Sequence, residues 1–88
     1  MKYYVFDNID KSLDRYTIIL ENGDLHSCSP NPFTEVGNYS HNVVEYEKKS
    51  LAECLAEVQQ NTDWLGVEIT DFTTLPKNVQ QYIQKLIN

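Results

Sequence analysis

Residues 14–29 read DRYTIILENGDLHSCS, and this stretch predicts a β-hairpin. The β-branched and aromatic run ahead of the turn is typical of a strand. Asn22-Gly23 is the strongest short-range signal for a hairpin turn, because both residue types tolerate a positive φ. A two-residue turn there would set Glu21 opposite Asp24, whereas a four-residue loop would separate these like charges. The pattern predicts the hairpin and leaves its register open between the two forms.

Three further short runs predict strands, at residues 2–6, 43–47 and 64–69. Gly66 in the last of these would let another backbone approach closely, because glycine has no Cβ. Residues 50–53, Ser-Leu-Ala-Glu, form a capping box and start a helix that ends near residue 61. Residues 74–76, Thr-Leu-Pro, start a last helix, since proline is well tolerated in a first turn.

These elements together predict an α+β fold. The 88 residues leave no room for a second hydrophobic core, so residues 1–88 are expected to form a single globular domain. Both predicted helices have one apolar stripe each, and the strands are joined mostly by short connections. We therefore predict a small, mostly antiparallel sheet of four to five strands, with the two helices packed on one face.

The charge balance restricts the partners that the chain can have. Seven basic and 13 acidic residues give a net charge of −6, and there is a single arginine. This composition argues against direct binding to nucleic acid or to an anionic membrane, where Lys and Arg supply most of the affinity. A basic partner is compatible with it. No N-terminal apolar core or membrane-length run is present, so we expect a cytoplasmic protein.

The cysteines and histidines predict neither a disulfide framework nor a metal site. Cys28 and Cys54 are too few for a disulfide scaffold and are expected to be reduced, buried thiols. His26, Cys28 and His41 lack the paired spacings of zinc ligands, although His26 and Cys28 would share a strand face. We expect no cofactor.

No catalytic motif is found in the sequence. It has no glycine-rich phosphate loop, no serine nucleophile elbow and no H-E-x-x-H motif. Asp7, Asp10 and Asp14 lie early in the chain, and carboxylates along a polar connection are usually solvated surface. The sequence therefore predicts that the protein is not an enzyme.

The non-periodic stretch from residue 29 to 42 is the first candidate for a binding surface. It combines aromatic anchors with amides, a glycine and an imidazole, the composition of a recognition loop. The residues predicted to bind are Asn31, Phe33, Gly37, Tyr39 and His41. The alternative is that Phe33 and Tyr39 only close the end of the core.

An acidic surface is the second candidate. Glu45 and Glu47 would share a strand face, while Glu53 and Glu57 lie one turn apart on a helix. We predict that Glu53 and Glu57 contribute to binding. Carboxylates of this kind could imitate nucleic acid, but the acidic residues are spread along the whole chain, which argues against that interpretation.

Several short motifs resemble a group of small uncharacterised phage and prophage proteins. The matching segments are Asp14-Arg15-Tyr16-Thr17-Ile18, the loop with Asn31-Pro32 and Gly37, Leu65-Gly66, and Leu75-Pro76-Lys77-Asn78-Val79-Gln80. The sequence departs from that pattern at Glu35, Val36 and Val67, where relatives have proline, glutamine and a basic residue. Compared with the shorter members of that group, residues 38–63 resemble an insertion. The resemblance implies a phage or mobile-element origin and no particular activity.

We therefore hypothesise a small acidic, non-enzymatic binding protein of phage or mobile-element type. It would act by occluding a host protein, as an anti-defence inhibitor does. One alternative is a protein that sequesters a small nucleotide-like signal, and another is an uncharacterised structural or regulatory phage component. The sequence identifies no target and leaves a homodimer open.

Overall fold

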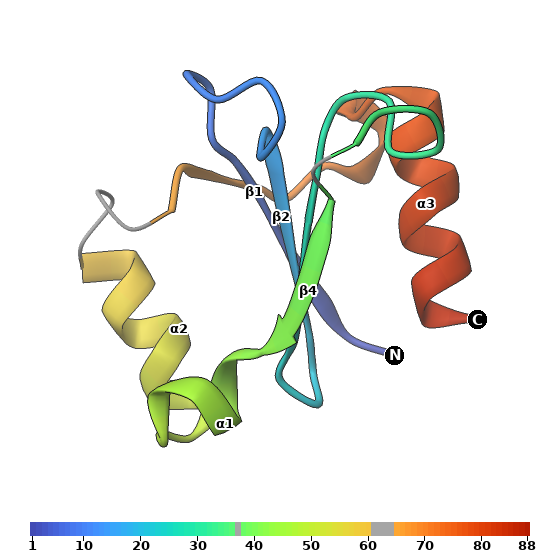
Figure 1. The fold of residues 1–88 in the computed structure, drawn as a ribbon. Coiled ribbons are helices and arrows are strands. Elements are labelled where there is room, and N and C mark those ends of the chain that lie inside the picture. The colour runs from blue at the N-terminus through green and yellow to red at the C-terminus, as the bar shows by residue number, and fades with distance from the viewer. Residues whose placement is uncertain (37, 61–64) are drawn as a thin grey trace.

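A five-stranded sheet in the order β4-β3-β2-β1-β5 forms the centre of the computed structural model, which describes residues 1–36, 38–60 and 65–88 (Figure 1). All neighbouring strands are antiparallel. The strands are β1 (Tyr3–Asp7), β2 (Tyr16–Leu20), β3 (Asp24–Cys28), β4 (Tyr39–Asn42) and β5 (Val67–Ile69). The helices are α1 (Val43–Glu47), α2 (Leu51–Gln60), a 3₁₀ turn (Phe72–Thr74) and α3 (Lys77–Ile87). The predicted α+β class and the antiparallel sheet are confirmed.

The central strand β2 is buried along its whole length, and its two faces belong to two different cores. Ile18 packs with residues of β1 and with Val79 and Ile83 of α3. Ile19 points the other way and packs with residues of α1 and α2, among them Val43. Ile18, Ile19, Val79, Ile83 and Val43 are all completely buried. The sheet is therefore the middle of three layers.

The prediction that both helices pack on one face is wrong. Figure 1 shows α3 on one side of the sheet and α1 and α2 on the other. The physical reason is that β2 carries Ile18, Ile19 and Leu20 in succession, which puts large apolar side chains on both faces of the strand. Such a strand has to be covered on both faces, whereas a strand with one solvated face alternates apolar and polar residues. The sequence of β2 therefore already indicated that both faces of the sheet are covered.

The hairpin turns through three residues, so neither predicted register is found. Ile19 pairs with Leu25 and Thr17 pairs with Ser27, which leaves residues 21–23 as the loop. The amide of Gly23 donates to the carbonyl of Leu20 at 2.9 Å, and Gly23 has a φ of +93°. This is a type I turn followed by a left-handed glycine, which is the usual three-residue hairpin.

The segment 43–47 forms α1 and not the predicted strand. The side chain of Asn42 accepts a hydrogen bond from the amide of Glu45 and so caps α1. The amide of Val43 donates to the carbonyl of Gly23 at 2.8 Å, which fixes the start of α1 over the hairpin turn. The fourth strand is instead built from residues 39–42, the end of the stretch predicted as a loop.

The capping box of α2 is confirmed. The amide of Glu53 donates to Ser50 Oγ at 3.2 Å, and the amide of Ser50 donates to Glu53 Oε1 at 3.4 Å. The helix is described to Gln60, and the predicted end at Asn61 lies outside the described residues, as does Trp64.

Gly66 lies against the backbone of β1, as its lack of a Cβ predicted. A Cβ at this position would overlap the carbonyl oxygen of Asp7 and lie 2.6 Å from the carbonyl carbon. The amide of Gly66 also donates to Asn8 Oδ1 at 2.6 Å. The glycine thereby allows β5 to begin beside the end of β1.

Replacing Gly66 with alanine is expected to lower the free energy of unfolding by about 1–3 kcal/mol, because the added methyl group has to displace backbone atoms. Urea denaturation measures this quantity. The control is Val67→Ala at the adjacent position, whose side chain is 61% exposed and whose loss should cost at most about 0.5 kcal/mol. Equal stabilities of the two variants would contradict the close approach.

Candidate functional site

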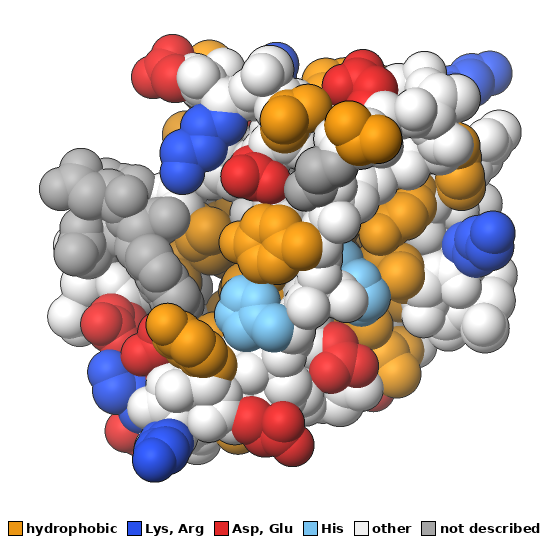
Figure 2. All heavy atoms as spheres, viewed as in Figure 1, with side chains coloured by type: hydrophobic (Ala, Val, Ile, Leu, Met, Phe, Trp, Pro, Cys, Tyr) orange, Lys and Arg blue, Asp and Glu red, His pale blue; other side chains and the backbone are white. Residues whose placement is uncertain are grey.

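Within the part of the chain that the structure describes, α1 and α2 cover their face of the sheet only in part, and a hollow of about 540 Å³ lies beside these helices. This volume is typical of pockets that hold a small ligand or a side chain of a partner. Its floor contains the pair Thr17 and Ser27 and the neighbouring Leu25. Its sides are the β1–β2 connection, β4, the end of α1, and Leu65. Figure 2 views the molecule from the β4 edge of the sheet, and a recess is visible to the left of the hydrophobic and histidine side chains at the centre.

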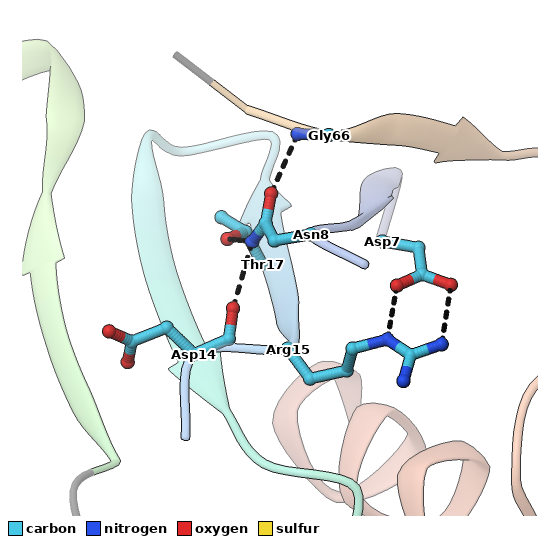
Figure 3. Close-up of polar contacts among 6 residues, drawn as sticks. All are labelled: Asp7, Asn8, Asp14, Arg15, Thr17 and Gly66. Carbon is cyan, nitrogen blue, oxygen red and sulfur yellow. Dashed lines mark hydrogen bonds and ion pairs between the residues drawn. The ribbon is translucent and has the colours of Figure 1, made fainter. Parts of the chain in front are cut away.

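The polar floor is held by Asn8, the residue that follows β1. Asn8 Nδ2 donates to Thr17 Oγ1 and to the backbone carbonyl of Asp14, both at 2.9 Å, and its oxygen accepts from Gly66 (Figure 3). One amide therefore connects the β1–β2 connection, the central strand and the start of β5. Both the nitrogen and the oxygen of the Asn8 side chain are bonded within the chain, so we assign Asn8 the role of holding the floor in place.

Asp14 places a carboxylate beside the floor. It is half-buried, and its Oδ1 accepts a hydrogen bond from Ser27 Oγ at 3.1 Å. Glu47, the last residue of α1, lines the same hollow from the helix side. Lys11 is the one basic residue among the described residues of the lining. The hollow thus has two carboxylates and one ammonium group.

The single arginine does not line the hollow. Arg15 forms a two-point ion pair with Asp7, with Nε–Oδ1 and Nη2–Oδ2 distances of 2.5 and 3.2 Å. Figure 3 shows this pair pointing away from Asn8 and Thr17. The hydrogen bond that Arg15 donates to Asp7 raises the pKa of Arg15. The guanidinium is therefore engaged in the scaffold and does not contribute a positive charge to the hollow.

A ridge of three rings stands along one side of the hollow. We call Tyr39, His41 and Tyr46 the aromatic ridge. The rings of Tyr39 and His41 are stacked with centroids 5.8 Å apart, and His41 meets Tyr46 edge-on at 5.5 Å. Tyr39 is 52% exposed and Tyr46 75% exposed. The ridge is therefore an accessible aromatic surface, and the alternative that Tyr39 closes the end of the core is wrong.

The predicted loop residues separate onto opposite sides of the sheet. Tyr39 and His41 lie on the face of the hollow, because they pair with Ser27 and Leu25. Phe33 packs edge-on against a ring of α3 at 5.9 Å.

Asn31 also belongs to the α3 side of the sheet. Its Oδ1 accepts a hydrogen bond from Asn78, next to the start of α3, at 3.3 Å. Gly37, the remaining predicted loop residue, lies outside the described residues. The described loop residues thus do not form one surface.

The two predicted glutamates have structural contacts on α2. Glu53 closes the capping box described above, and Glu57 accepts a hydrogen bond from Lys49 Nζ at 2.8 Å. Both side chains are exposed, and neither lines the hollow. Glu45 and Glu47 do not share a face either, because residues two apart on a helix point in different directions.

Sequence reasoning missed Tyr46, placed Glu47 on a strand in an acidic surface, and interpreted Asp14 only as solvated surface. The first two were assigned to a strand, although Asn42 followed three residues later by Glu45 is a helix start signal. Recognising that signal would have placed Tyr46 four residues beyond Asn42, on the helix that follows β4. Asp14 carries no signal of its own in the sequence, since its position depends on the fold of the β1–β2 connection.

The two thiols lie in different cores, and the two histidines lie on opposite faces of the sheet. Cys28 belongs to the core under α3 and Cys54 to the core under α2. Burial raises the pKa of Cys28 to about 12 and also raises that of Cys54, which disfavours the reactive thiolate. His26 lies on the face of Cys28, opposite His41, and the described residues contain no group of three potential metal ligands.

No protein-family model, curated protein or solved structure matches the chain. Within the described residues, no helix is both long and apolar enough to cross a membrane.

Mild acid should destabilise the fold through His26. Partial burial lowers the pKa of this imidazole below its ordinary value of 6.5, so the unfolded chain binds the proton more readily. The contribution of His26 to stability is therefore present above about pH 6.5 and is lost as the pH falls toward the lower pKa of the folded state. The melting temperature should fall less in His26→Gln than in the wild type between about pH 7.5 and pH 5. If the melting temperatures of His26→Gln and the wild type fell equally over this pH range, His26 would not be the cause of the acid destabilisation.

Proposed function

We propose that the chain is a non-enzymatic binding protein that covers part of a host protein with the hollow and the aromatic ridge. The observation that carries this proposal is the hollow, where a concave polar floor adjoins exposed aromatic rings. Protein interfaces have this composition: aromatic anchors are enriched at their centre, and partner side chains fill adjacent pockets.

The aromatic ridge supports a protein partner. Tyr39 and Tyr46 are both largely exposed. Exposed apolar patches on a folded protein often mark sites where a partner binds. Their positions are fixed by secondary structure, since Tyr39 belongs to β4 and Tyr46 to α1. Such side chains lose little conformational entropy when a partner covers them.

The charge of the molecule favours a basic partner. The net charge of −6 creates a negative potential that accelerates association with a positively charged surface. Exposed carboxylates of α1 and α2, among them Glu45 and Glu57, contribute to this charge. The resemblance of the hairpin, the Asn-Pro turn and the last helix to phage and prophage proteins suggests that this partner is a host component.

The volume of the hollow favours a second candidate function, the sequestration of a small molecule. A nucleotide-like ligand would need positive charge for its phosphates. Lys11 is the one such group in the described lining, and Arg15 is paired with Asp7. The electrostatics therefore support a phosphorylated ligand less well than a protein partner.

Affinity capture from host lysate tests the proposal. The double variant Tyr39→Ala/Tyr46→Ala should capture at most about one tenth of the partner that the wild type captures, as expected for the loss of two interface anchors. The matched control is Gln81→Ala/Gln84→Ala, which changes two exposed residues of α3 on the opposite side of the sheet. Circular dichroism checks that both variants are folded.

Equal capture by the ridge variant and the wild type would contradict the proposal, as would a loss confined to the α3 variant. Native mass spectrometry of the purified protein separates the two candidate functions, because a retained small ligand would favour sequestration. Charge reversal at the predicted binding residue Glu53 would not test binding alone, because Glu53 caps α2 and the substitution would also disturb the helix.

A further inference from the structure

We infer that the hollow receives an arginine side chain of the partner protein, an inference that rests on the proposed function. The hollow combines carboxylates, hydroxyl groups, aromatic rings and apolar side chains within about 540 Å³. Each of these groups suits a different part of an arginine.

The carboxylates suit the guanidinium group. Asp14 approaches the hollow from the β1–β2 connection and Glu47 from the end of α1, while Lys11 is the one positive charge among the described residues that line it. The hydrogen bond from Ser27 uses one lone-pair direction of Asp14, and a carboxylate offers about four. Asp14 therefore keeps the capacity to accept the two parallel hydrogen bonds that an arginine donates.

The aromatic ridge favours arginine over lysine. A planar guanidinium stacks on aromatic rings, whereas an ammonium group is a compact and strongly hydrated charge. His41 and Tyr46 line the hollow with rings at a steep angle to each other, 68° between their planes. A planar cation can therefore lie flat on one ring and meet the edge of the other.

The apolar part of the lining suits the stem of the same side chain. Leu25 and Leu65 line the hollow together with the polar floor of Thr17 and Ser27. An arginine can bury its methylene groups on the leucines and keep its charged head on the polar groups. A purely apolar side chain would instead remove the carboxylates of Asp14 and Glu47 from water without giving them a new partner, which is costly.

A titration with short capped peptides tests the inference. The probe is acetyl-Gly-Arg-Gly-amide, followed by ¹H–¹⁵N NMR of the whole protein. The matched control is the same peptide with citrulline, which has the shape of arginine without its charge. We expect saturable shifts at Ser27, His41 and Glu47, and at least about tenfold weaker binding of the citrulline peptide, as expected for the loss of a charged hydrogen-bonding group.

Two neighbouring glutamates of α1 supply the matched protein variants. Glu47→Gln should weaken binding of the arginine peptide several-fold, and Asp14→Asn should do the same while keeping an acceptor for Ser27. Glu45→Gln should leave binding unchanged, because Glu45 is exposed and does not line the hollow. Equal binding of both peptides, or equal effects of the two glutamate variants, would overturn the inference.

The two proposals can fail separately. If the arginine peptide does not bind while capture of the partner still depends on Tyr39 and Tyr46, the arginine inference is wrong and the proposed function stands. If capture is also independent of the ridge, both are wrong.

Discussion

Burial of β2 on both faces is the constraint on which the rest of the structure depends. All five residues of this strand are buried, and Ile18 and Ile19 point into different cores. A sheet with such a central strand needs a cover on each side. The last helix covers one side, and α1 with α2 covers the other. The three-layer arrangement follows from this strand and not from the helices, each of which has only one apolar stripe.

Among the described residues, the cover on the second side is incomplete, and this produces the candidate site. The first turn of α1 is anchored over the hairpin turn by the bond from Val43 to Gly23, so the helices cover the sheet near Ile19 and Leu25. Two pairs further from the turn, which is the next pair on the same face, the sheet presents Thr17 and Ser27 in place of apolar residues. Polar groups there are satisfied by Asn8 and Asp14, and the space above them stays open.

The sequence predicted those features that depend on neighbouring residues. The capping box at Ser50 and Glu53, the stripe of α3 and the close approach at Gly66 each follow from local patterns, and the structure has all three. The antiparallel α+β class followed from the order of these elements. The register of the hairpin did not, because Asn22-Gly23 fits several turn lengths and the three-residue loop also involves the packing of Asn42 on the turn.

The candidate site could be predicted only in part. Tyr39 and His41 were identified from composition, but their separation from Asn31 and Phe33 depends on β4 joining the sheet. A polar stretch does not reveal which face of a sheet its residues will reach. Asp14 and Glu47 are far apart in the sequence, and long-range topology alone brings them to one hollow.

Hydrogen–deuterium exchange on the protein alone and in complex with its captured partner tests most directly that the hollow and the aromatic ridge form the binding surface. The account predicts slower exchange in the complex for the amides of residues 8–14 and 39–47, with α3 unchanged. Protection confined to residues 77–87, with residues 39–47 unaffected, would contradict it.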